Sequence, residues 1–204
     1  MKNLKLTFVL CVMFLCSSLT LRAQTTQTPP VNTSSTSQTN TYQFPDSKTR
    51  FKRYVNSVVG IGALAGTIVG ATFQQINNEP AEWKKTKNGF ARRVGSNFGQ
   101  NTIKQTTLYG LSEAFKQDSE YQKCSCTSIL KRVGHALKYG FVSPNHQGKE
   151  VFSPGKVVSP FVANVAAVKL WYPDRFSVND GMRSGTYSLG FSVGFNLIKE
   201  FIFK

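Results

Sequence analysis

The residue best suited to acid–base chemistry is His135, because imidazole is the side chain whose ordinary pKa lies near neutrality. It falls in a predicted helix, and two carboxylates, Glu113 and Asp118, precede that helix. A histidine oriented by either carboxylate could act as a general base, which keeps an envelope enzyme as the alternative interpretation. No nucleophile stands in a recognisable catalytic motif. We therefore favour a structural role for His135 and a protein without enzymatic activity.

Two cysteines, Cys124 and Cys126, are separated by one residue and lie between the carboxylates and the histidine. In an oxidising compartment they form a candidate redox pair, since a very short loop favours a reducible disulfide. Metal ligation would need His135 and His146, but zinc sites usually present closely spaced ligand pairs on both sides, and these histidines are single. We expect no metal and no cofactor. The simplest interpretation of the two cysteines is a loop with two incidental thiols.

The N-terminal residues 1–23 have the organisation of a cleavable signal peptide. Lys2 and Lys5 precede an apolar run from Leu6 to Leu15, and Ala23 stands at the expected cleavage position. The run of about ten residues is well short of the roughly twenty that span a bilayer. The segment predicts export to the periplasm or association with the envelope membrane.

The charge of the chain is strongly positive, with 25 Lys and Arg residues against 10 Asp and Glu residues and a net charge of +15. Removal of residues 1–23 deletes three basic residues and no acidic one, which leaves 22 against 10 and a net charge of +12. In the cytosol such an excess would indicate nucleic acid, because phosphate neutralisation drives non-specific binding. Export argues against nucleic acid and favours a membrane surface or anionic envelope polymers as partners.

A local cluster of basic residues is the candidate contact with anions or membrane, and it lies near the start of a long predicted helix. Its members are Lys84, Lys85, Lys87, Arg92 and Arg93. Acidic lipid head groups would be attracted to such a cluster. A solvated helix face is the alternative interpretation.

The chain divides into three regions by composition. Between the signal peptide and the domain, residues 24–47 are rich in Thr, Ser, Gln and Pro and contain almost no aliphatic residue, which predicts a disordered tether. The remaining residues 48–204 are numerous enough to bury a core and form a single predicted helical domain.

Small residues recur at helical spacing in two long segments. Gly62, Gly66 and Gly70 lie four residues apart in the uncharged segment from Tyr54 to Asn78. A second stripe runs through a predicted helix from about residue 89 to residue 116, and it consists of Ala91, Gly95, Gly99, Thr102, Thr106, Gly110 and Ala114. Such spacing puts small residues on one helix face, where a neighbouring helix approaches closely. We expect both stripes to pack against other helices.

Three further helices complete the predicted domain. They cover residues 128–138, residues 158–170 with a small face at Ala163, Ala166 and Ala167, and residues 177–202, where Ser177 and Asp180 have capping-box spacing. Residues 141–157 contain two prolines and two glycines and predict a loop. The expected fold is all-α, a compact bundle of about five helices with glycine- and alanine-rich packing faces.

The segment from Tyr54 to Asn78 is long enough to cross a membrane, but its Asn, Gln and Thr residues favour a helix buried in the bundle. Trp83 and the pair Trp171-Tyr172 have two interpretations, as aromatic residues at a membrane interface or as packed corners. In either case we expect the protein to lie near a membrane.

Several local motifs carry a resemblance to other proteins. They are Glu82-Trp83, the run from Gly89 to Gln100, Asp118 with Tyr121, Trp171-Tyr172-Pro173-Asp174, and Gly194-Phe195-Asn196. With them the chain resembles a group of uncharacterised exported helical proteins of environmental bacteria over nearly all of residues 54–201. The resemblance implies secretion and a shared helical domain, and it implies no activity and no site.

Overall fold

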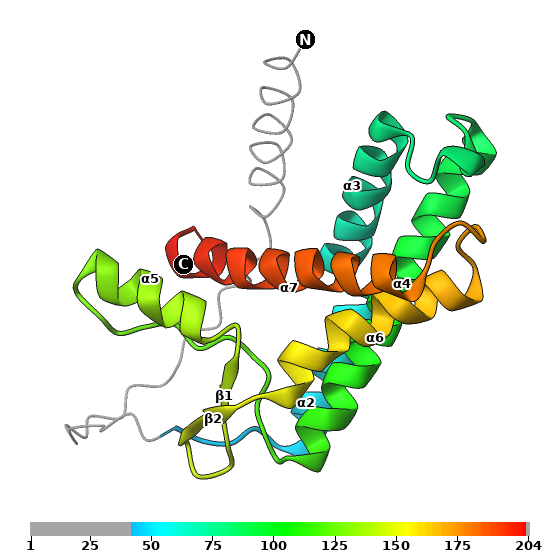
Figure 1. The fold of residues 1–204 in the computed structure, drawn as a ribbon. Coiled ribbons are helices and arrows are strands. Elements are labelled where there is room, and N and C mark those ends of the chain that lie inside the picture. Colours follow the sequence, from blue (N-terminus) through cyan, green and yellow to red (C-terminus); the bar gives the residue numbers. More distant parts are fainter. Residues whose placement is uncertain (1–41, 203–204) are drawn as a thin grey trace, which may run out of the picture. The chain divides into compact units, whose positions relative to one another are not determined.

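Two consecutive helices, α2 (Ser47–Val59) and α3 (Ile61–Asn77), form a kinked rod antiparallel to the long helix α4 (Lys87–Ala114) in the computed structural model, which describes residues 42–202 (Figure 1). The rod begins earlier than predicted because the Asp46 side chain caps α2 by accepting a hydrogen bond from the Thr49 N–H. It is interrupted at Gly60, whose backbone is extended (ψ 159°). The predicted single helix from Tyr54 to Asn78 is therefore two helices.

The turn from α3 to α4 is built from unusual backbone conformations. Asn78 ends α3 in the left-handed region (φ 56°), the Glu79–Pro80 peptide is cis, and the short 3₁₀ helix η2 (Ala81–Trp83) follows. Thr86 then caps α4 by accepting from the Gly89 N–H at 3.1 Å. These local features bring the ends of α3 and α4 together.

The second half of the domain contains α5 (Ile129–Lys138), strands β1 (Val142–Pro144) and β2 (Glu150–Phe152), α6 (Pro154–Leu170) and α7 (Val178–Phe201). The strands pair antiparallel, with Val142 opposite Phe152. Residues 141–157, predicted as a loop, therefore hold a small hairpin and the first turn of α6. The capping box at Ser177 and Asp180 is confirmed at the start of α7.

Small residues pack closely where α6 crosses α7 and α4. A Cβ at Gly185 would lie 2.6 Å from the Phe161 ring, and one at Gly181 would lie 2.9 Å from the Val165 Cα. Gly155 faces Leu108 of α4 in the same way, and Ala163 and Ala167 are buried. The predicted all-α bundle is confirmed, and small residues form packing faces where α6 crosses α7 and α4.

The two longest predicted stripes do not pack in this way. A Cβ at Gly62, Gly66, Gly95 or Gly110 would meet no atom within 4 Å, and Gly70 faces only the Asn97 side chain. The prediction that both stripes pack against other helices was wrong, because α3 and α4 contact each other through polar side chains instead. Gln74 donates to Asn97, and Asn97 donates to the Thr67 carbonyl.

The N-terminal border of the domain lies before residue 48. Tyr42 donates a hydrogen bond to Asp118, and Arg50 lies over the Phe44 ring at 4.7 Å. Residues 42–47, assigned from composition to the tether, thus contact the domain. The predicted signal peptide and residues 24–41 of the predicted tether lie outside the described residues.

Candidate functional site

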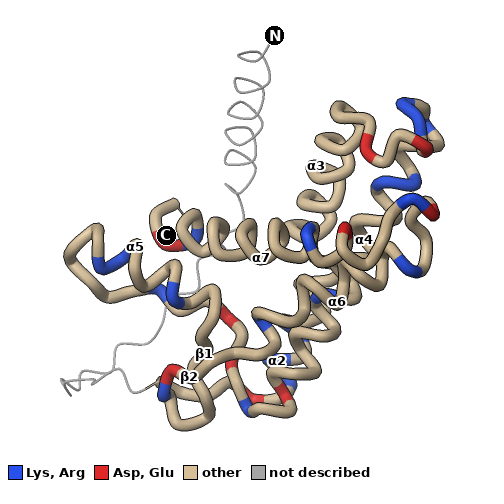
Figure 2. Tube along the Cα trace, in the orientation of Figure 1, with Lys and Arg blue, Asp and Glu red and all other residues tan. Residues whose placement is uncertain are grey.

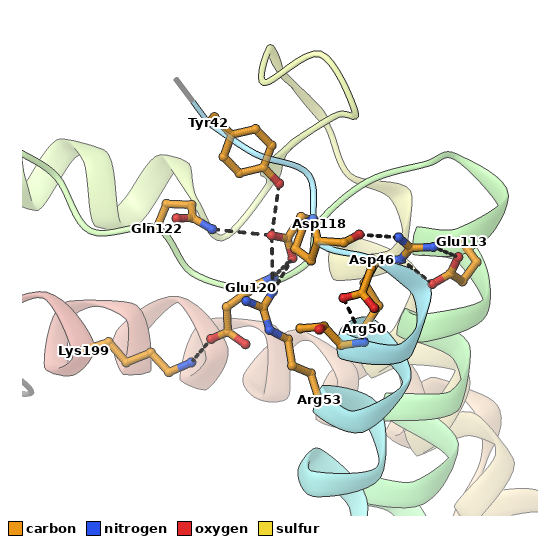
Figure 3. A network of polar contacts seen from close by, with 11 residues as sticks. Tyr42, Asp46, Arg50, Arg53, Glu113, Asp118, Glu120, Gln122 and Lys199 are labelled. Carbon is orange, nitrogen blue, oxygen red and sulfur yellow. Dashed lines mark hydrogen bonds and ion pairs between the residues drawn. The ribbon is translucent and has the colours of Figure 1, made fainter. Parts of the chain in front are cut away.

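Asp118 is the centre of a polar network just beyond the end of α4 (Figure 3). The residue is 3% exposed. Its carboxylate accepts hydrogen bonds from the Tyr42 hydroxyl at 3.0 Å and from the Glu120 N–H at 3.1 Å. Arg53 of α2 pairs with it at 3.2 Å, and Gln122 donates at 3.5 Å. Because several donors already occupy both oxygens, Asp118 holds the segment around Tyr42 and helix α2 against its own segment, residues 118–122.

Glu113, the last residue but one of α4, is engaged in the same way. Arg50 donates from two guanidinium nitrogens to its two oxygens, each at 2.7 Å (Figure 3). The hydrogen bond from Arg50 holds the pKa of the Glu113 carboxyl below its ordinary value. Two arginine–carboxylate pairs therefore join α2 to the C-terminal end of α4 and to the segment that follows it.

A polar pocket of about 490 Å³ opens beside this network, lined by residues that include Arg53, Asp118, Tyr139 and Glu150. Burial raises the pKa of the Tyr139 hydroxyl to about 12, and the Glu150 carboxylate adds to the effect. Lys156 donates to the carbonyls of Tyr139 and Val142, and burial lowers the pKa of its ammonium group to about 8. The ionisable groups around the pocket are engaged in structural contacts, so none is poised as a general base.

His135 lies apart from both candidate carboxylates. Its ring lies tilted against Tyr139, at 4.3 Å between centroids, and edge-on to Tyr121, at 6.0 Å. Within residues 42–202 no hydrogen bond joins His135 to Glu113 or Asp118, and its buried Nδ1 has no hydrogen-bond partner there. The acid–base pair considered from the sequence is not assembled, because arginines of α2 hold the two carboxylates.

Glu200, near the end of α7, is a site residue that the sequence did not single out. Its side chain is 0% exposed and accepts from Arg132 and the Tyr121 hydroxyl, each at 2.7 Å, and from the Cys124 N–H at 3.2 Å. Burial alone raises the pKa of this carboxyl, but the hydrogen bonds outweigh it and lower the pKa to about 2. The only sequence signal was the charged pair Lys199-Glu200 after the uncharged residues 184–198, and such a pair is a weak signal.

Cys124 and Cys126 are joined by a disulfide in the segment that leads into α5. The segment is held by Glu200 through the Cys124 N–H, independently of the sulfur–sulfur bond. Among the described residues no three His, Cys, Asp or Glu side chains come together as a metal site would require. Redox activity of the pair stays a prediction.

The predicted basic cluster separates into two kinds of residue. Arg93 is 0% exposed and donates to the carbonyls of Glu79, Pro80 and Lys84 at 2.8 Å each, and to Gln75 Oε1 at 2.6 Å. The prediction that Arg93 contacts anions or membrane was wrong, because its guanidinium donates to carbonyls of the α3–α4 turn and is buried. The other four members of the cluster are exposed, namely Lys84, Lys85, Lys87 and Arg92.

The rod of α2 and α3 is largely uncovered, which contradicts the prediction of a buried helix. It is long and apolar enough to cross a membrane by length and composition, and it is the one such helix in the part of the chain that the structure describes. Only 17% of its most apolar stretch is buried. Six exposed side chains define the apolar face of the rod, namely Phe51, Val55, Val59, Ile61, Leu64 and Ile68.

Comparison of the chain with protein-family models, curated proteins and solved structures gives no match. The resemblance to exported helical proteins therefore stays a prediction, and function must be argued from the geometry.

Proposed function

We propose that this is an exported, non-enzymatic envelope protein that lies against an anionic membrane surface through α2 and α3. The observation that carries the proposal is the apolar face of the rod, where Ile61 is 89% exposed and Ile68 is 50% exposed. Contiguous exposed apolar surface on a protein marks an interaction site. A helix with such a face binds at the boundary between head groups and acyl chains.

The charges around the rod favour an anionic surface. No acidic residue occurs between Ser47 and Asn77, whereas Lys48 and Lys52 are exposed beside Phe51. At the other end, α3 leads to the exposed Lys84, Lys85 and Lys87, and between the two basic ends α3 is uncharged (Figure 2). Each lysine near an anionic leaflet adds about 1 kcal/mol of attraction.

The packing of α3 on α4 favours a helix that lies in the plane of the membrane over one that crosses it. Thr67 and Ala71 face α4 and are buried, and the contact includes the hydrogen bonds of Asn97 to α3. A crossing helix would carry these amides of α4 into the hydrocarbon, where polar groups are costly. An in-plane helix inserts only its apolar face.

Co-sedimentation of the purified protein with vesicles tests the proposal. We expect binding to vesicles rich in phosphatidylglycerol and much weaker binding to phosphatidylcholine, with added salt releasing the protein. The double substitution Ile61→Glu with Ile68→Glu should weaken binding at least about 100-fold, because two apolar side chains no longer insert. Leu130→Glu is the matched control, since Leu130 is 82% exposed on α5 and lies outside the apolar face.

Two outcomes would refute the proposal. One is a wild-type protein that stays in the supernatant with anionic vesicles at low salt. The other is a double variant that sediments as the wild type does. Circular dichroism of both variants checks that the helices are intact. We expect them to be intact because the substituted residues are exposed.

A further inference from the structure

Both tryptophans of the chain line one pocket, although they are far apart in sequence. The pocket has a volume of about 420 Å³ and is lined by Trp83, Arg92, Gly95, Ser96, Gly99 and Trp171. We call it the tryptophan pocket. It lies between the first half of α4, the 3₁₀ helix before α4 and the turn that follows α6. Its volume falls within the range of pockets that bind small molecules.

The walls of the tryptophan pocket are held in place by specific contacts. The Trp171 indole N–H donates to Ser96 Oγ at 2.8 Å, and its ring lies 3.3 Å from the position of a Cβ at Gly99. Trp83 is buried against Tyr172, at 5.3 Å between ring centroids. Glycines on α4 leave the space between the two indoles open, because a Cβ at Gly95 would meet no atom within 4 Å.

The polar groups of the pocket are few, and Ser96 and the Trp171 indole N–H are already engaged. Ser96 accepts from Trp171 and also from Gln100 at 3.0 Å, and the other lining groups besides Arg92 are indoles and glycines. A sugar would need donors and acceptors for its hydroxyls, and these walls do not offer them. The walls suit an apolar body.

Arg92 supplies the one charge of the lining. It is exposed and has no ion pair or hydrogen bond among the described residues, in contrast to its neighbour Arg93. The carboxylate of Glu82, next to Trp83, already pairs with Arg175. An unpaired guanidinium at the edge of an apolar pocket is complementary to a carboxylate or phosphate group.

We propose that the tryptophan pocket binds a single-chain amphipathic anion, with the acyl chain between the two indoles and the carboxylate or phosphate at Arg92. This inference goes beyond the membrane contact and does not depend on it, because the apolar face of α2 and α3 contributes no residue to the pocket. Free fatty acid and a single-chain phospholipid share the required chemistry.

Tryptophan fluorescence reports on the pocket directly, because no other tryptophan exists in the chain. We expect dodecanoate, added below its micelle concentration, to change the emission saturably, and dodecyl phosphate to do the same. Whichever binds more tightly indicates the source of the natural ligand. The methyl ester of dodecanoate should bind about tenfold more weakly, since it offers Arg92 no charge.

Variants distinguish the two parts of the site. Arg92→Gln should weaken dodecanoate about tenfold and leave the methyl ester unchanged. Gly95→Leu should abolish binding of both by filling the pocket. Gly110→Leu is the matched control, because it adds the same side chain to the same helix at another open position.

Three results would overturn the proposal: no saturable change with either anion, binding by Gly95→Leu equal to that of Gly110→Leu, or equal affinity for dodecanoate and its ester. The Ile61→Glu and Ile68→Glu double variant should bind dodecanoate as the wild type does. A double variant that loses vesicle binding and keeps dodecanoate binding therefore tests the membrane contact and the tryptophan pocket separately.

Discussion

Arg92 and Arg93 are adjacent in sequence and have opposite environments. Arg93 is enclosed by the α3–α4 turn and donates to three of its carbonyls, whereas Arg92 is exposed. Within this turn the Pro80 carbonyl also accepts from the Trp83 N–H, whereas Arg93 supplies the donors for the carbonyls of Glu79 and Lys84. Arg93 therefore joins the turn to α4 through its guanidinium.

Substitution of Arg93 by alanine should lower the free energy of unfolding by about 3 to 5 kcal/mol, because several buried acceptors lose their donor. Urea denaturation monitored by circular dichroism measures the change. Arg92→Ala is the control and should differ from the wild type by less than about 0.5 kcal/mol. Equal stability of the two variants would contradict the structural role assigned to Arg93.

Glu200 makes stability depend on acid pH. Its carboxyl pKa is lowered from 4.5 to about 2 in the folded protein, so the folded state favours the ionised form. The contribution is complete above the unfolded pKa and is lost as pH falls toward the folded pKa, because the unfolded chain takes up the proton first. The free energy of unfolding should therefore decline as pH falls from about 5 to about 2.

The variant Glu200→Gln should be less stable than the wild type at neutral pH by about 2 to 3 kcal/mol, and the difference should shrink as pH falls to about 3. Urea titrations at several pH values give both quantities. Glu79→Gln changes an exposed carboxylate and serves as the control. A pH-independent difference between wild type and Glu200→Gln would show that the carboxylate charge is not what stabilises the α5–α7 contact.

At the scale of elements, α7 approaches α6 closely. Gly181 and Gly185 let the backbones come together, and Phe161 and Val165 of α6 occupy the space that side chains on α7 would fill. Helix propensity alone would favour alanine at both positions. Tertiary packing requires glycine there.

Gly185→Ala should therefore destabilise the domain by about 1 to 3 kcal/mol, since the added methyl group displaces Phe161. Gly190→Ala on the same helix should stabilise it by up to about 1 kcal/mol, because a Cβ there meets no atom within 4 Å. Thermal denaturation of the two variants side by side measures both effects. A stabilising Gly185→Ala would mean that α6 and α7 lie farther apart than described.

The glycine spacing that predicts these contacts is the same on three helices, yet only part of it is used. On α7 Gly181 and Gly185, four residues apart, pack against α6. On α4 only Gly99 touches Trp171, and on α3 Gly62 and Gly66 face open space. Spacing places small residues on one face, but it does not say what lies opposite. That choice depends on how helices far apart in sequence cross.

At the scale of the whole molecule, a net positive charge accompanies exposed apolar side chains. The excess of basic over acidic residues, +15 for the chain, is accompanied by apolar side chains that the fold leaves exposed along α2 and α3. A soluble domain of this length can normally bury such side chains. The combination is what an interfacial protein needs, since attraction to anionic head groups and insertion of apolar side chains reinforce each other.

Helix boundaries and caps could be predicted from the sequence because their causes are local. Ser128 precedes α5, Ser177 and Asp180 form the capping box of α7, and the stripe of small residues marks α4 to within a few residues. Two local features were missed: the break at Gly60 and the hairpin between α5 and α6. Each depends on backbone conformations that composition does not specify.

The amino-acid sequence by itself determined the all-α class, most helix limits and the basic charge, because caps, periodicity and composition act over a few residues. Only the tertiary structure decided which candidate groups meet. Glu113 and Asp118 pair with arginines of α2 and leave His135 to two tyrosines, while Glu200 gathers Arg132 and Tyr121. Such contacts join residues that lie tens of positions apart, and their partners are selected by helix crossings that no local pattern encodes.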